Sequence, residues 1–155
     1  MKYAIETKLR DLFKAASSLD DVKVFSIGEP VFIIQQHFPM VIIFLEQRLT
    51  LTEETGIWVY NYIGYLAAET FIRDDYEIKD REMDVTSLLT MRDILDAVTD
   101  VIEENLSLDN IVDDTETVRN IQAGDKIYGL RQRDNNMLNR GEVNFAVQTQ
   151  KTRVC

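Results

Sequence analysis

The sequence has 155 residues, of which 17 are Lys or Arg and 27 are Asp or Glu, so its formal net charge is −10. A chain this acidic repels the phosphate backbone, which disfavours a general nucleic-acid-binding protein but allows one past which DNA slides without sticking. The single cysteine, Cys155, excludes an intramolecular disulfide, and no apolar run reaches the roughly 20 residues of a membrane span. The acidic N-terminal segment lacks the apolar core of a signal peptide, so we expect a protein made in the cytoplasm, with one domain over residues 1–155.

Apolar residues recur at helical spacing near the N-terminus, at Ile5, Leu9, Leu12, Phe13 and Ala16. Charged residues lie between them, so the pattern predicts an amphipathic helix over roughly residues 2–18 that packs one stripe on a sheet. The Ser and Asp residues of 17–21 favour a turn. A short strand is expected over 22–25, before Gly28-Glu29-Pro30.

The centre of the chain predicts a long β-hairpin. Its first arm covers residues 38–46, where the unbroken apolar run 41–45 is typical of a central strand buried on both faces. Its second arm runs from about Ile57 to Arg73, with Gly64 as the natural site for a bend or bulge. Residues 48–56 are predicted to form the turn region, in which Gly56 can adopt a positive φ.

Trp58, Tyr60 and Tyr62 share one face of the second arm, because side chains alternate along a strand. A hairpin tip that is apolar on both faces needs cover from a helix or from another subunit. The neighbouring residues include Glu53 and Glu54 rather than a cluster of Lys and Arg. Core or subunit-interface packing therefore fits these aromatic residues better than base stacking.

The second half of the chain predicts another helix and another hairpin. Apolar residues at helical spacing indicate an amphipathic helix over 85–106, followed by an acidic stretch over 108–119. The final strands are expected over 122–131 and 142–154, with a turn region over 134–141. This order predicts an α+β fold: a mainly antiparallel sheet with a long hairpin, flanked by two principal helices.

Few residues offer catalytic or metal-binding chemistry. Glu77-Ile78-Lys79 matches the E-x-K half of a metal-dependent nuclease signature, although a solvated loop accounts for these residues as well. The acids of the 108–119 stretch do not have the spacing of a Ca²⁺ loop, and a solvated or partner-facing loop fits them better. They are Asp109, Asp113, Asp114 and Glu116. His37 has no second histidine or cysteine nearby, so a loop histidine is the default.

The order and spacing of these segments resemble the tail terminator family of long-tailed phages, also called tail completion or head–tail joining proteins. The resemblance rests on the helix ending near Leu19, the 38–43 entry to a central strand, the hairpin through 57–73, the helix 88–106 and the closing strand 139–147. It implies a virion protein without catalytic residues, cofactor or metal, which assembles as a six-subunit ring. Such a ring caps the head-proximal end of the tail tube, contacts the tail tube protein and the head connector, and lets DNA pass without specific binding or contact with a membrane.

Under this reading Glu53, Glu54, Trp58, Tyr60 and Tyr62 lie at a subunit interface. The acids Asp109, Asp113, Asp114 and Glu116 face the lumen or a partner. Two alternatives stay open: another neck or head–tail joining protein of similar fold, and a small cytoplasmic Mg²⁺-dependent nuclease that uses Glu77 and Lys79.

Overall fold

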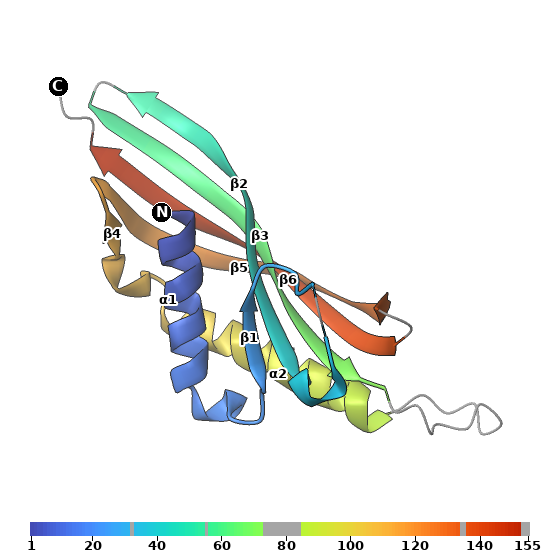
Figure 1. Cartoon of the computed structure of the whole chain (residues 1–155). Helices are drawn as coiled ribbons and strands as arrows, with labels where there is room; N and C mark the ends of the chain where they lie inside the picture. Colours follow the sequence, from blue (N-terminus) through green and yellow to red (C-terminus); the bar gives the residue numbers. More distant parts are fainter. Residues whose placement is uncertain (32, 55, 73–84, 134–135, 153–155) are drawn as a thin grey trace.

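The computed structural model describes residues 1–31, 33–54, 56–72, 85–133 and 136–152, with the backbone alone for Glu53, Glu54, Val85 and Thr86. Within these residues a six-stranded sheet has the order β1-β2-β3-β6-β5-β4 (Figure 1). The elements are α1 (Lys2–Ala15), β1 (Val24–Ile27), β2 (Met40–Glu54), β3 (Ile57–Phe71), α2 (Val85–Glu104), β4 (Val112–Asp113), β5 (Glu116–Arg133) and β6 (Asn136–Thr152). β1 is parallel to β2 and the other pairs are antiparallel, which confirms the predicted α+β fold.

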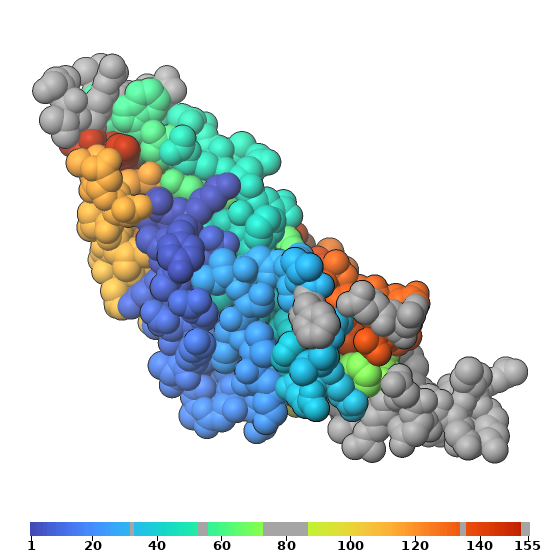
Figure 2. Space-filling view, viewed as in Figure 1, coloured from blue at the N-terminus to red at the C-terminus, as the bar shows by residue number. Residues whose placement is uncertain are grey.

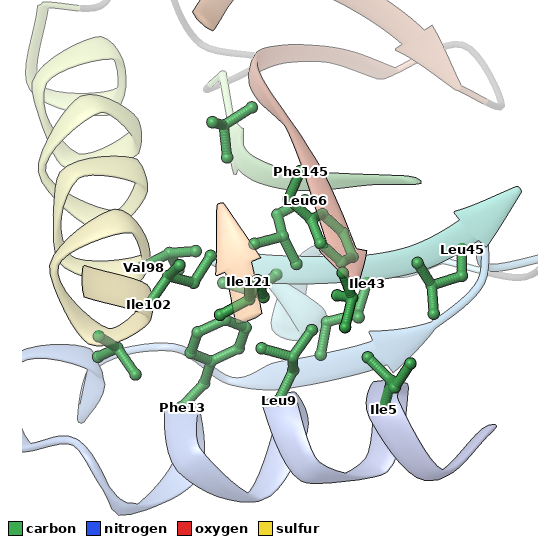
Figure 3. Close-up of a cluster of buried hydrophobic side chains, with 14 of the residues drawn as sticks. Ile5, Leu9, Phe13, Ile43, Leu45, Leu66, Val98, Ile102, Ile121 and Phe145 are labelled. Carbon is green, nitrogen blue, oxygen red and sulfur yellow. The ribbon is translucent and has the colours of Figure 1, made fainter. Parts of the chain in front are cut away.

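Both helices pack on the same face of the sheet. Ile5, Leu9 and Phe13 are fully buried on α1, and Figure 3 shows them pointing toward the strands. α2 contributes a second apolar stripe to the same cluster, with Met91, Leu95, Val98 and Ile102. Each fully buried side chain of this kind contributes about 1.5–3 kcal/mol. The helical periodicity of the sequence therefore identified the main core correctly.

The opposite face of the sheet carries a smaller apolar cluster. Ile33 and Phe38, from the connection between β1 and β2, cover Met40, Ile42, Ala67 and Leu138 on the strands. Because Val41, Ile43 and Leu45 face the helices while Met40 and Ile42 face this connection, β2 is buried on both faces. The prediction for the apolar run 41–45 is confirmed.

The strands are longer than their sequences indicated, so three predicted boundaries are wrong. β2 continues to Glu54 through the predicted turn region, and the tight turn is confined to the residues around Gly56, whose φ is 88°. β5 begins at Glu116, inside the predicted acidic loop, and β6 begins at Asn136, inside the predicted turn region. Turn-forming residues are accommodated because the ladder pairs their backbone groups: Asn139 pairs with Thr70 and Gly141 with Ala68.

Gly64 lies opposite a β-bulge whose extra residue is Glu46 on β2, whereas the prediction placed the bulge at Gly64 itself. Gly64 pairs with Leu45 on β2, where the register shifts between Leu45 and Gln47. A Cβ at position 64 would lie 2.1 Å from the carbonyl oxygen of Phe44, so this approach of the two backbones requires glycine. The bulge is held from α1: the Leu45 N–H donates to Glu6 (3.2 Å), and Lys2 donates to the Glu46 carbonyl (3.2 Å).

Candidate interaction surfaces

The described residues offer no metal centre. Among them, no group of three or more His, Cys, Asp or Glu side chains is placed to hold a metal ion. Glu77 and Lys79 lie outside the described residues, so the nuclease hypothesis that uses them stays untested. Among the described helices, none combines the length and the apolar character of a membrane span.

The aromatic face of β3 differs from its predicted role. Tyr60 and Tyr62 are 8% and 3% exposed and belong to the main core cluster, which corrects their assignment to a subunit interface. Within the same chain, the Arg48 guanidinium lies 4.5 Å from the centroid of the Tyr60 ring, and Tyr62 donates to Glu116. Trp58 is half-buried beside this core and stacks on Tyr60, with ring centroids 6.4 Å apart. Of the three aromatic residues, it leaves the most surface for a partner.

Glu116 is also placed differently from the expectation. Its side chain is only 5% exposed, and it accepts hydrogen bonds from Tyr62 at 2.6 Å and from Thr149 at 2.9 Å. A carboxylate bonded in this way is a structural acid that joins β3, β5 and β6, and it does not face a lumen or a partner. The expectation for Glu116 is therefore corrected.

The other three acids of this stretch are exposed. Asp109 forms an ion pair with Lys8 at 2.5 Å, Asp114 lies 3.7 Å from Lys151, and Asp113 lies 2.6 Å from the amino group of Met1. Asp109 and Asp114 have φ of 56°, a backbone conformation that Asp tolerates better than most residues. The three acids thus lie together near α1 and β4, on a surface accessible to a partner.

Two long stretches of strand edge lack a partner strand among the described residues. β1 pairs only with Met40–Ile43 of β2, so the outer edge of β2 is open from about Gln47 to Glu54. β4 pairs only with Glu116 and Thr117 of β5. The N–H groups of Val118 and Ile121 bond to carbonyls of the preceding loop, and β5 is open beyond them, over 122–133.

The two open edges lie at opposite ends of the elongated sheet. Figure 1 shows the β2–β3 turn at one end and the β5–β6 turn at the other. In Figure 2 the teal distal part of β2 lies along the upper part of one long border, and the orange atoms of β5 and β6 extend from there toward the opposite end of the molecule. This separation of the open edges follows from the topology. β1 covers the start of β2, β4 covers the start of β5, and β2 and β5 run in opposite directions, so their uncovered halves lie at opposite ends.

Each open edge exposes large apolar side chains. On β2, Leu51 is 52% exposed and Leu49 is 38% exposed. On β5, Ile127 is 61% exposed, and Tyr128 and Leu130 are also open to solvent. A groove of 240 Å³ runs along β5 from Ile127 to Arg131 and is closed on β6 by Arg140 and Glu142. Unpaired edges with exposed apolar residues are typical sites of strand-to-strand association.

A charge cluster on the sheet face opposite the helices was missed by the sequence analysis. Glu69 is fully buried and accepts from Arg140 at 2.7 Å and from Arg133 at 3.0 Å. Glu29, on the β1–β2 connection, pairs with both arginines and accepts from the Tyr65 hydroxyl at 2.7 Å. Burial alone would raise the pKa of Glu29, but hydrogen bonds from Arg140, Tyr65 and Arg133 lower it to about 2. The cluster therefore fixes the connection on the sheet.

Comparison with known proteins supports the fold and goes no further. No protein-family model matches the sequence, and no curated protein matches it. A chain from a solved structure of the "Virion of native gene transfer agent (GTA) particle" is similar, with a TM-score of 0.58 at 13% identity over 94% of each chain. A second solved structure, also at 13% identity and covering 94% of this chain and 91% of its own, has a TM-score of only 0.38. The α+β architecture is thus shared with a component of a virion particle.

Proposed function

We propose that this chain is a structural protein of a phage-like virion, which forms a ring on the head-proximal end of a tail tube. In this role it stops tube growth and presents a docking face to the head connector. The ring would be a hexamer, as the resemblance to tail terminators implies, and its partners would be the tail tube protein and a connector or neck protein. The proposed role is mechanical and requires no catalysis.

The observation that carries this proposal is the pair of open sheet edges with exposed apolar side chains. A closed ring of identical subunits needs two different patches on each copy, because every contact is head-to-tail. The distal parts of β2 and β5 are two such patches, at opposite ends of one sheet. A likeness of fold to a chain of a virion particle adds support.

The charge of the chain suits a passage for DNA. A net charge of −10, repeated around a ring, surrounds the lumen with acids and gives little affinity for phosphate. We assign the exposed Asp109, Asp113 and Asp114 to the lumen or to a partner surface. Trp58, together with Glu53 and Glu54 at the hairpin end, is assigned to a subunit or tube contact.

Size-exclusion chromatography with light scattering, followed by electron microscopy of the chain alone, with purified tail tubes and with isolated necks, tests the proposal. We expect rings of the chain alone, or caps at one end of the tubes. Caps at the connector side of isolated necks instead would indicate another head–tail joining protein of similar fold. A monomer that leaves tubes uncapped and has a Mg²⁺-dependent nuclease activity lost in Glu77→Ala would overturn the structural role.

A further inference from the structure

We propose that the open edge of β2 in one copy pairs with the open edge of β5 in the next copy, so that neighbouring sheets join into one. This inference rests on the ring proposed above and specifies its subunit contact. Both edges expose backbone groups that a second strand can bond, over Gln47–Glu54 on β2 and over 122–133 on β5. These stretches are long enough for a ladder of several residues.

The strand directions are compatible with this pairing. Successive neighbours from β2 through β3 and β6 to β5 are antiparallel, so β2 and β5 run in opposite directions within one sheet. A second copy placed beside the first in the same orientation therefore brings β2 antiparallel to β5. The joined sheet then continues the pattern already present in each subunit.

The two short strands set a stagger between copies. β1 covers the beginning of β2, and β4 covers the beginning of β5, so a neighbour can reach only the distal half of each edge. The second copy must consequently be displaced along the strand direction. A stagger of this kind is what a closed sheet requires, because the strands of a barrel tilt relative to its axis.

Charge disfavours a contact between two β2 edges, and both the β2 and the β5 edge supply apolar surface for the β2–β5 pairing. Gln47–Glu54 contains two Glu and one Arg and is therefore acidic, whereas the basic side chains of the 122–133 edge are already paired within the chain, Lys126 with Asp96 and both Arg131 and Arg133 with Glu29. Leu49 and Leu51 on one edge and Ile127 and Leu130 on the other supply the apolar surface. Pairing β2 with β2 would oppose two acidic stretches, which is unfavourable.

Lysine substitutions on each edge test the pairing, because an edge lysine opposes strand addition. One variant blocks the β5 edge with Ile127→Lys and Leu130→Lys, and another blocks the β2 edge with Leu49→Lys and Leu51→Lys. The control, Val31→Lys with Leu106→Lys, adds the same charge at exposed apolar positions outside both edges; Val31 is 98% exposed. Sedimentation velocity and microscopy on tail tubes measure the assembly of each.

We expect the control to assemble like the wild type, and each edge variant alone to be monomeric and unable to cap tubes. An equimolar mixture of the two edge variants should form one-to-one dimers and nothing larger, because one intact β2 edge meets one intact β5 edge. Rings or caps formed by either edge variant as readily as by the control would overturn the pairing while leaving the ring function intact. Dimers of the β2-edge variant alone would overturn it in favour of β5–β5 contact. Absence of both rings and caps in the wild type would instead overturn the ring function, and the pairing with it.

Discussion

The phenolic hydroxyl of Tyr62 on β3 donates a 2.6 Å hydrogen bond to the buried carboxylate of Glu116, 54 residues away in the sequence. Thr149 on β6 donates a second bond to the same oxygen atom, at 2.9 Å. These bonds connect β3, β5 and β6, and Tyr62 also lines a hollow with residues 1–3 at the start of α1. The geometry explains why an acid of the predicted loop is an internal part of the sheet.

Removal of the Tyr62 hydroxyl should destabilise the fold. In Tyr62→Phe the buried Glu116 keeps, of its hydrogen bonds to described residues, the one from Thr149, and a lost hydrogen bond to a charged group costs about 1.5–3 kcal/mol. Urea unfolding followed by circular dichroism measures the loss. The control is Tyr3→Phe, because Tyr3 is 68% exposed and should show no change. Equal midpoints for the two variants would contradict a structural role for the Tyr62–Glu116 bond.

Gly64 and Gly129 should respond differently to the same substitution. A Cβ at position 64 would lie 2.1 Å from the Phe44 carbonyl oxygen and 2.9 Å from the Leu45 Cα, whereas a Cβ at position 129 meets nothing within 4 Å. We expect Gly64→Ala to cost about 3 kcal/mol through overpacking at the bulge, and Gly129→Ala to be nearly neutral. Thermal melts of the two alanine variants make the comparison directly. A Gly64→Ala protein as stable as Gly129→Ala would mean that the bulge can relax.

The Glu29 cluster should make stability depend on acidity. Folding lowers the pKa of the Glu29 carboxyl from 4.5 to about 2. The ionised carboxylate therefore stabilises the fold above pH 4.5, and this stabilisation is lost as the pH falls toward 2. Because Glu29 remains partly open to water, we expect a loss of about 1–2 kcal/mol. Glu29→Gln should remove this part of the pH dependence, as measured by urea unfolding between pH 2 and pH 7. The control, Asp20→Asn at an exposed position, should keep the wild-type dependence of stability on pH. If Glu29→Gln keeps that dependence as well, the ion cluster does not stabilise the connection between β1 and β2.

The parts of the fold that follow from periodicity were predictable. The stripe of Ile5, Leu9 and Phe13 identified α1, and the apolar run 41–45 identified a strand covered on both faces. Strand ends were not predictable, because the residues that decide them bond to partners far along the chain. Asn139 has the composition of a turn, yet it is buried in β6 because its side chain donates to Ser87 on α2 at 3.0 Å.

The charge cluster shows the same limit. Arg131 and Arg133 are two residues apart on β5, so their side chains lie on the same face of the sheet. This spacing is a weak signal that the two arginines share binding partners. Nothing in the local sequence relates these arginines to Glu29 or Glu69. The β3–β6–β5 register brings Glu69 to Arg133, and the β1–β2 connection brings Glu29 to Arg131. The roles assigned to Tyr60 and Glu116 were wrong for a related reason, since alternation reveals which face a residue occupies but not what covers that face.

The helix–sheet contact should not tolerate a charge. Leu95 lies on the buried stripe of α2 with no exposed surface, and an unpaired carboxylate there has no partner to compensate its desolvation. We expect Leu95→Asp to unfold the chain, since the cost of several kcal/mol approaches the whole stability of a domain. Leu89 lies on the same helix and is 49% exposed, so Leu89→Asp should remain folded. Circular dichroism and proteolysis compare the two variants, and a folded Leu95→Asp protein would contradict the assigned core.

Trp58 should matter more for assembly than for folding, in contrast with its stacking partner Tyr60. Tyr60 is 8% exposed, so Tyr60→Ala removes core packing and should cost about 3–5 kcal/mol in urea unfolding of the dilute chain. Trp58 is half-buried at the border of that core, so we expect Trp58→Ala to cost about 1–2 kcal/mol while reducing ring formation or tube capping at least tenfold. Sedimentation velocity above and below the assembly concentration separates the two effects. If Trp58→Ala loses as much folding stability as Tyr60→Ala and assembles in proportion to its folded fraction, Trp58 belongs to the core, and the hairpin end makes its contacts through other residues.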